Sequence, residues 1–307
     1  MNTHGIRPLL TSLAAAFLVA CSGSDSPGTG TLSIAVTDAP IDGVMEVVVQ
    51  FDGVTLKPKI GSQVEYRFDT HKSIDLKQLT DGKVELLFDR EVPAGQYIWM
   101  KLDVNAEFDG IPDSYVIEDG GGQVELRIPP DRLKLGNEFT VLQGGTTVFV
   151  IEWNLRMGLT NPVGQPGYKL QPSLRITDMT EYGTIAGMVN PNLLPPNDNS
   201  CTSDSNTGDG NVVYVFEGLN VPPDDIDGVL PDPLTTADVR LNIDSGNQEY
   251  LVPFLSIGDY TVAFTCQGAD DAVPDEENPE LLVDDAIDFT AGVNATVLNG
   301  ETTTVDF

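Results

Sequence analysis

Short runs in which apolar and polar residues alternate dominate this chain from residue 31 onward. In the first half they lie at 32–36, 45–51, 96–104, 124–128, 147–155 and 168–176. A period of two is that of a half-buried β-strand, and the Gly and Pro residues between the runs mark turns. One short helical turn is expected at residues 73–79. The pattern predicts an all-β chain with antiparallel sheets.

A second group of strands begins near Gly183. We expect strands at 184–189, 212–216, 238–243, 249–254, 259–266, 286–290 and 302–307. Residues 191–210 form a loop by composition, and residues 268–285 form a loop rich in acids. The length of 307 residues suits two domains, each with its own core. We therefore predict two antiparallel β-sandwiches of the immunoglobulin-like or transthyretin-like kind, at residues 31–180 and 183–307.

The two halves share short sequence signals in the same order. Gly95-Gln96-Tyr97 opens a strand in the first half, and Gly258-Asp259-Tyr260 opens one in the second. Further along, LQGGTT at residues 142–147 parallels LNGETT at residues 298–303. Similar turn chemistry explains either match alone, but the ordered pair favours two related sandwiches.

The beginning of the chain is typical of an export signal. Residues 1–8 carry one base, Arg7, and residues 9–20 are a 12-residue apolar run, shorter than the about 20 residues of a membrane-spanning helix. Leu18-Val19-Ala20-Cys21 resembles the bacterial lipobox. The resemblance implies cleavage after residue 20, lipidation of Cys21 and stable anchoring by its acyl chains. Residues 21–30 then form a flexible tether.

Ser22 follows the lipidated cysteine, a position where aspartate is the signal for retention in the inner membrane. We therefore expect a lipid anchor in the outer membrane, and both the periplasmic and the cell-surface face stay open. An ordinary signal with a chance cysteine is the alternative, but Leu18 does not suit the small-residue site that such a signal prefers.

The charge is strongly negative. Lys and Arg number 16 against 47 Asp and Glu, for a net charge of −31. Residues 183–307 hold 23 of these acids and one base, Arg240. Such a surface repels nucleic acid and anionic lipid headgroups, so neither is an expected partner. It can attract divalent cations or simply keep the protein soluble.

Besides Cys21, the chain has two cysteines, Cys201 and Cys266. In an exported protein such a pair most often forms a disulfide, and closing a loop of about 65 residues stabilises the fold by roughly 4 kcal/mol. Zinc is the weaker alternative. It requires further nitrogen or sulfur ligands, and His71, the one histidine after residue 20, lies far away in sequence.

Four segments together resemble a family of bacterial lipoproteins that carry the domain of unknown function 4382. These segments are TLSIAVTDAP at 31–40, IDL at 74–76, VPAGQY at 92–97 and YKLQPSLRI at 168–176. The resemblance covers about half of the chain and implies no catalytic residues. Residues 254–262 (FLSIGDYTV) are similar to the hairpin of carboxypeptidase-regulatory and transthyretin-like sandwiches. That second resemblance implies a fold shared with carbohydrate-binding modules, and a fold alone does not define a function.

Catalytic signals are scarce. The sequence has no nucleophile elbow, no HExxH helix and no phosphate-binding loop. His71 lies in a polar stretch and is expected to be a solvated loop residue. A carboxylate pair that cleaves glycosides cannot be chosen among 47 acids without geometry. We therefore expect a protein that is not an enzyme, and keep a hydrolase of envelope or extracellular polymers as an alternative.

Calcium is the one cofactor that the sequence suggests. Two loops offer clustered side-chain oxygens, which calcium prefers: Asp204, Asn206 and Asp209 in the first, and Asp224, Asp225 and Asp227 in the second. The spacing does not fit an EF-hand, and Val215 occupies the place of its last glutamate. Acidic loops held in solution by their charge are the alternative, which we favour.

Tyr97 and Trp99 are a candidate platform for a sugar ring or a protein partner. In strict alternation they share a polar face with Lys101, and Trp153 belongs to the core. The alternative, which we favour, is that Trp99 lies beneath a loop or the other domain. Asp38 before Ala39-Pro40 is expected to cap a turn by bonding backbone two residues further on.

These observations predict an outer-membrane lipoprotein that binds or scaffolds without catalysis. Its expected partners are the membrane, through the anchor, and a glycan or a protein. A calcium-stabilised adhesive module is the second hypothesis, favoured by the acidic loops of the second half.

Overall fold

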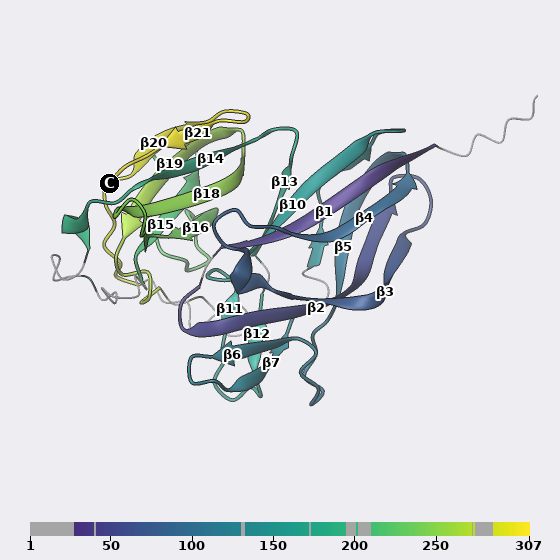
Figure 1. Ribbon diagram of the computed structural model, residues 1–307, viewed down its shortest axis with the longest axis horizontal. Coiled ribbons are helices and arrows are strands. Elements are labelled where there is room, and N and C mark those ends of the chain that lie inside the picture. Colours follow the sequence, from purple (N-terminus) through teal and green to yellow (C-terminus); the bar gives the residue numbers. More distant parts are fainter. Residues whose placement is uncertain are drawn as a thin grey trace, which may run out of the picture.

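The computed structural model describes residues 28–39, 41–129, 133–171, 173–194, 201, 210–271, 273 and 285–307. Its regular structure is almost entirely β-strand, arranged in four sheets (Figure 1). The all-β class predicted from the alternation is therefore confirmed. Among the described residues, no helix combines the length and the apolar character that crossing a membrane requires.

The N-terminal sandwich has a four-stranded and a nine-stranded sheet. The four-stranded sheet has the order β13-β10-β1-β4, with β1 at Thr29–Ala39, β4 at Glu85–Pro93, β10 at Thr146–Asn154 and β13 at Ser173–Asp178. The nine-stranded sheet has the order β11-β12-β7-β6-β2-β5-β8, with β3 also paired to β2 and β9 to β5. Its strands are β2 at Val44–Pro58, β3 at Val64–Asp75, β5 at Gly95–Asn105, β6 at Tyr115–Glu118, β7 at Gln123–Arg127, β8 at Lys134–Leu135, β9 at Phe139–Val141, β11 at Leu159–Thr160 and β12 at Tyr168–Leu170.

A single core fills the space between these two sheets. The edge of Phe51 on β2 meets the ring of Trp153 on β10, with ring centres 5.7 Å apart. Both side chains are fully buried, as are Ile34, Leu87 and Met100 from neighbouring strands. Alternate residues of β1 (Leu32, Ile34, Val36) and of β10 (Phe149, Ile151, Trp153) supply this core, as the period of two predicts. The expected helical turn is a short 3-10 helix, η1 at Leu76–Leu79, whose first turn is capped by Asp75.

The C-terminal sandwich pairs two four-stranded sheets. One has the order β17-β18-β14-β21, with β14 at Tyr182–Met188, β17 at Arg240–Leu241, β18 at Gln248–Ser256 and β21 at Thr302–Thr304. The other has the order β16-β15-β19-β20, with β15 at Val212–Glu217, β16 at Thr235–Asp238, β19 at Gly258–Thr265 and β20 at Val293–Val297. A 3-10 helix, η3 at Pro191–Leu193, follows β14.

The core of the C-terminal sandwich also joins its two sheets. Phe307 lies near Tyr250 of one sheet and Phe264 of the other, with ring centres 6.2 and 6.3 Å away. The predicted disulfide between Cys201 and Cys266 is present beside this core. The bond closes a separation of 65 residues, and it ties residue 201 to the residue that follows β19.

The outer face of the β15 sheet is covered by loops. Val212, Tyr214 and Phe216 of β15 point outward from the main core into a smaller cluster with Ile226. The ring of Phe289 packs edge-on against Tyr214, at 5.1 Å between ring centres. The strand expected at 286–290 is therefore absent: Phe289 lies over β15, and the strand that follows is β20, at Val293–Val297.

The two sandwiches repeat the same construction. Each first strand pairs in parallel with the strand that follows the shared glycine turn: β1 with β10, and β14 with β21. The turns use Gly144 and Gly300 with positive φ of 67° and 71°, which glycine adopts without strain. Tyr97 and Tyr260, the other shared signal, are both buried and donate from their hydroxyls to the carbonyls of Pro93 and Ser256.

Gly30 and Gly183 mark the same contact in each half. A Cβ on Gly30 would lie 2.1 Å from the carbonyl oxygen of Leu142, and one on Gly183 would lie 2.5 Å from that of Leu298. Only glycine permits the first strand to pass this close to the turn. The shared sequence signals therefore occupy equivalent places, as expected for two related sandwiches.

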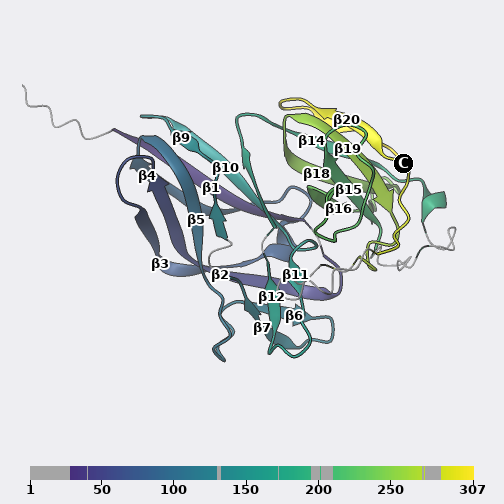
Figure 2. The same ribbon diagram turned by 180° about the vertical axis from the view of Figure 1, so that it is seen from behind.

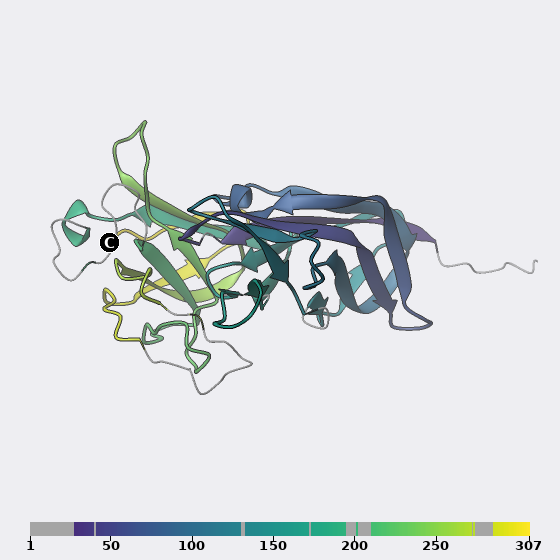
Figure 3. The same cartoon turned by 90° about the horizontal axis from the view of Figure 1, so that it is seen from below.

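The sandwiches lie end to end (Figures 1 and 2). β1 begins at the end of the N-terminal sandwich that is remote from the C-terminal sandwich, and it runs toward the junction between them. Seen from below, the two halves form one elongated body (Figure 3). This arrangement separates the two ends of the described chain.

Candidate functional site

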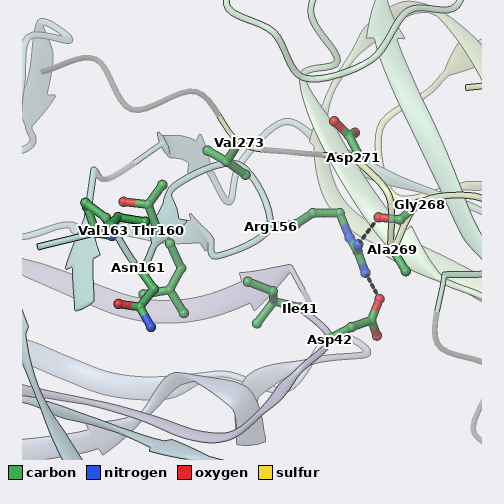
Figure 4. A pocket seen from close by; sticks show the side chains of 12 residues that line it. Ile41, Asp42, Arg156, Thr160, Asn161, Val163, Gly268, Ala269, Asp271 and Val273 are labelled. Atoms are coloured by element: carbon green, nitrogen blue, oxygen red, sulfur yellow. Dashed lines mark hydrogen bonds and ion pairs between the residues drawn. The ribbon is translucent and has the colours of Figure 1, made fainter. Parts of the chain in front are cut away.

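A buried arginine joins the two sandwiches. Arg156 lies in the turn between β10 and β11 and is 4 % exposed. It donates to Asp42 (Oδ2 at 2.7 Å) from its own sandwich, and to Asp238 (Oδ1 at 3.2 Å) and the carbonyl oxygen of Gly268 (2.8 Å) from the other. Figure 4 shows the bonds to Asp42 and Gly268. A planar guanidinium can hold these three acceptors at once.

The charges at this junction depend on one another. Burial alone would raise the pKa of Asp42, but the charge of Arg156 and its hydrogen bond hold that pKa below its ordinary value. Burial raises the pKa of Asp238, and Arg156 opposes that rise. The pKa of Arg156 itself lies above its ordinary value, because Asp238 and Asp42 outweigh the effect of its burial. The two carboxyl groups therefore share one guanidinium, and a change at any of the three groups affects the other two.

A second arginine strengthens the junction. Arg175 on β13 pairs with Glu152 on β10 at 2.5 Å and donates to the carbonyl oxygen of Phe254 on β18. Glu152 also accepts from the hydroxyl of Thr235, at 2.6 Å, on β16. Phe254 has a φ of 55°, in the left-handed region that a bulky residue rarely adopts. That conformation accompanies a carbonyl on which both Arg175 and Thr177 converge.

Asp38 lies near the same junction, in a role that the sequence did not indicate. It is 6 % exposed, and its Oδ1 accepts from the backbone of Leu155, 117 residues away. Its Oδ2 has no hydrogen-bond partner. The prediction that Asp38 caps a turn two residues further on is therefore wrong. Burial raises the pKa of Asp38 well above its ordinary value. The hydrogen bond from Leu155 opposes this rise, whereas the charges of Glu152 and Asp238 add to it.

A cavity of about 610 Å³ opens beside Arg156. Its walls come from the segment after β1, the turn and loop around β11, and the segment after β19 (Figure 4). The lining is Ile41, Asp42, Arg156, Leu159, Thr160, Asn161, Pro162, Val163, Gly268, Ala269, Asp271 and Val273. Its two carboxylates are engaged within the chain, Asp42 by Arg156 and Asp271 by Tyr214. The cavity thus offers a mixed polar and apolar surface.

The predicted aromatic platform does not form as a pair. Tyr97 is 2 % exposed and stacks on Phe139 in the core, whereas Trp99 is half-buried with the ammonium of Lys134 above its ring, 4.6 Å from the centre. The register against β2 shifts between Lys57 and Pro58, opposite Trp99 and Tyr97. This bulge breaks the alternation, so that Tyr97 and Met100 both face inward.

The candidate calcium ligands are partly rearranged. Asp204, Asn206 and Asp209, like the candidate lipidation residue Cys21, lie outside the described residues. Asp227 bonds the backbone of Val229 in its own loop. Asp225 instead lies beside Asp271 and Asp285, which are distant in sequence, and these three form an acidic cluster to which Asp224 and Asp227 do not belong.

His71 was expected in a loop, and Arg156 was not expected to have a role. His71 lies on β3 rather than in a loop; its ring is exposed and its Nδ1 is 2.6 Å from Asp52. No motif in the sequence singles out Arg156. A usable signal exists, since this arginine directly follows a buried strand in a chain with few bases. A base at such a place must find acids from another segment when it is buried.

The architecture is that of an all-β protein of two sandwiches with an ion-paired junction. Residues 29–172 match the family model described as "Domain of unknown function (DUF4382)", so the N-terminal sandwich contains a DUF4382 domain. The resemblance of the first half is thereby confirmed, and that of the second half stays a prediction. None of the curated proteins matches the chain.

Several solved structures show a distant likeness. They include the Bacillus anthracis TIE protein (11 % identity, TM-score 0.19) and GBS52, the minor pilin of Streptococcus agalactiae (11 %, 0.19). A fimbrial protein from Bacteroides ovatus is also similar (8 %, 0.21). In the order named, the matches cover 91, 90 and 91 % of this chain. They cover 34, 94 and 48 % of the length of those three proteins. Scores this low do not establish a shared fold.

Replacing Arg156 tests the junction. We expect Arg156→Met to lower the free energy of unfolding by about 3–5 kcal/mol, because it leaves Asp42 and Asp238 buried without their shared base. Arg156→Lys should recover part of the loss, since an ammonium cannot hold three acceptors in one plane. Chemical denaturation measures both variants.

Arg67→Met is the matched control for Arg156→Met. Arg67 pairs with Glu65 on the exposed surface of β3, and its loss should change the free energy of unfolding by less than about 0.5 kcal/mol. A loss at Arg156 no larger than that at Arg67 would contradict the structural role assigned to the junction.

Asp38 should make stability depend on pH. Because its folded pKa is raised, the folded state holds a proton that the unfolded chain releases above about pH 4. Wild-type stability therefore falls as the pH rises from that point through the folded pKa. Asp38→Asn keeps an acceptor for Leu155 and lacks this titration, so its stability relative to wild type should grow over the same window.

Denaturation curves at a series of pH values measure this difference. Asp69→Asn, at an exposed position of β3, is the control and should follow the wild-type dependence. If Asp38→Asn also runs parallel to wild type across the window, the buried carboxyl of Asp38 does not titrate as described.

Proposed function

We propose that the protein is a lipoprotein, anchored at Cys21 in the outer membrane, that binds or scaffolds at the cell envelope without catalysis. The lipobox at residues 18–21 supports the anchor, and the small polar residues after it supply a tether. The alternative of a hydrolase has less support, because the carboxylates of the junction cavity are both bonded within the chain.

The observation that carries this proposal is the end-to-end arrangement of the sandwiches. β1 begins at the end remote from the C-terminal sandwich (Figure 1). An anchor ahead of β1 therefore holds the N-terminal sandwich next to the membrane and the acidic C-terminal sandwich away from it. The junction of Arg156 and Arg175 keeps the two in fixed relation, since bending it would expose ion pairs that are buried. In this geometry the C-terminal sandwich is presented at a fixed distance from the membrane, as in a protein that offers a binding surface there.

The junction cavity is the binding site that we assign to this module. It is concave, opens between the two sandwiches and combines apolar side chains with the polar side chains of Thr160 and Asn161. Val163 stands fully exposed at its rim. A glycan or a protein loop fits a surface of this mixed character. Trp99 is a weaker candidate, because Lys134 lies over its ring.

The anchor is tested by the mass of the mature N-terminus. In the native bacterium we expect a chain that begins at Cys21 and carries acyl chains, found in the outer-membrane fraction. The Cys21→Ser variant should leave that fraction, because one thiol carries the attachment. A wild-type chain that retains residues 1–20, or that has a free thiol at Cys21, would refute the anchor.

The binding site is tested on the released Cys21→Ser form, with glycan arrays and with capture of envelope proteins. Ala269→Arg places a long charged side chain at the exposed wall of the cavity and should weaken binding at least about tenfold, or ~1.4 kcal/mol. Trp99→Ala is the comparison and should bind as the parent does. Loss of binding in Trp99→Ala with full binding in Ala269→Arg would move the site to β5.

A further inference from the structure

Three aspartates from separate segments meet on the outer face of the β15 sheet. Asp225 lies in the loop after β15, Asp271 follows β19, and Asp285 precedes β20. Each offers a carboxylate oxygen within 4.8 Å of the others. The segments that bring them together are held over β15 by the small cluster of Tyr214, Ile226 and Phe289.

The carboxylates are positioned by hydrogen bonds. Asp271 accepts from the hydroxyl of Tyr214 at 2.5 Å and from the backbone of Ile226 at 3.1 Å. Asp225 accepts with Oδ2 from the backbone of Asp285 at 2.7 Å. These bonds fix two of the carboxylates and connect the three segments. The cluster is therefore part of the packed structure rather than a chance meeting of surface acids.

One oxygen of the cluster lacks a partner. Asp225 is 2 % exposed, and its Oδ1 accepts no hydrogen bond from the protein. A buried carboxylate oxygen without a partner costs free energy, and native structures normally satisfy such atoms with water or an ion. Neither Asp225 nor Asp271 forms an ion pair with a base in the described part of the chain.

The electrostatics also call for a positive charge. Burial raises the pKa of Asp225 to about 6, and the charges of Asp271 and Asp227 contribute to this rise. The hydrogen bond from the backbone of Asp285 opposes it. Burial likewise raises the pKa of Asp271, although Tyr214, Ile226 and the charge of Arg156 oppose it. Arg156 is already bound to Asp42 and Asp238. Burial and mutual repulsion therefore disfavour the charged carboxylates of Asp225 and Asp271, and a bound cation would offset both effects.

We propose that Asp225, Asp271 and Asp285 bind a calcium ion that holds these three residues and the backbone beside them against β15. An all-oxygen set of carboxylates suits a hard cation. Calcium lies about 2.3–2.6 Å from its ligands, and three carboxylate oxygens that all lie within 4.8 Å of one another are close enough to share one such ion. Magnesium requires near-ideal octahedral geometry and gives up its water reluctantly, so calcium is the expected occupant.

The site differs from the one that sequence clustering suggested. It shares Asp225 with that prediction, and it takes its other ligands from segments 46 and 60 residues further on. It adjoins the junction cavity, which Asp271 also lines. The measurements below detect the ion itself, so their outcome is distinct from that of the anchoring and binding experiments.

Terbium luminescence tests binding directly, because terbium replaces calcium and is excited by a nearby aromatic ring. Tyr214 is bonded to Asp271 and is placed to act as that donor. We expect tyrosine-sensitised emission that calcium displaces. The Asp225→Asn and Asp271→Asn double variant should bind at least about tenfold more weakly, since affinity follows the number of charged ligands. Tyr214→Phe keeps the aromatic ring in the packed cluster but lacks the phenol that sensitises terbium, so the emission should fall while the fold is kept.

Thermal unfolding of the Cys21→Ser chain gives the second measurement. Calcium at about 100-fold above its Kd should raise the Tm by about 5 °C or more, with magnesium less effective. In a chelator, Asp225→Asn should melt at or above the wild-type Tm, because it removes repulsion, and it should gain less from calcium. This opposite behaviour distinguishes loss of an ion site from simple misfolding.

Asp244→Asn is the matched control, because Asp244 is an exposed residue of the same sandwich and its loss changes the charge equally. It should respond to calcium as wild type does. A wild-type Tm that calcium does not move, or terbium binding that the double variant retains, would overturn the site. Equal loss in Asp244→Asn would mean general attraction to the acidic surface instead.

Discussion

The relation between the two sandwiches depends on Arg156. Its guanidinium is buried between two carboxylates and a carbonyl, one from its own sandwich and two from the other. A buried charge is tolerated only with such partners, so the position of each partner constrains the other sandwich. The same region includes Arg175, Glu152 and Asp38, which bring further buried polar groups to the contact. The junction therefore combines several buried polar groups with the apolar contact of Met157 against the cluster on β15.

Within each sandwich the dominant constraint is the approach of the first strand to a glycine turn. Gly30 and Gly183 lie so close to the turn carbonyls that no side chain fits. This contact starts the parallel pairing of β1 with β10 and of β14 with β21. The sheet that contains β1 and the sheet that contains β14 therefore each have one parallel pair among antiparallel ones. The buried tyrosines at positions 97 and 260 then hold the turn that leads from one sheet to the other.

Much of the fold could be predicted from the alternation, and the failures have local causes. The strand pairs around Phe51 and Trp153 follow the period of two, and the two cysteines of the second half pair as expected. The alternation places Tyr97 on the wrong face, because a bulge opposite Pro58 breaks the period of two with no glycine or proline between Tyr97 and Met100. Residues 286–290 resemble a strand in sequence, but Phe289 is used to cover Tyr214. Arg156 and the cluster of Asp225, Asp271 and Asp285 depend on long-range contacts that no local pattern encodes.

The placement of β1 has a mechanical consequence. A pull at Thr29 is transmitted along β1, which pairs with β10 from Thr31 to Ala39 and with β4 from Thr29 to Val36. If the opposing force acts on the C-terminal sandwich, these ladders are loaded in shear, and many hydrogen bonds must break together instead of one after another. The fold therefore resists a force applied between Thr29 and the C-terminal sandwich more strongly than one that would peel β1 away from its partners.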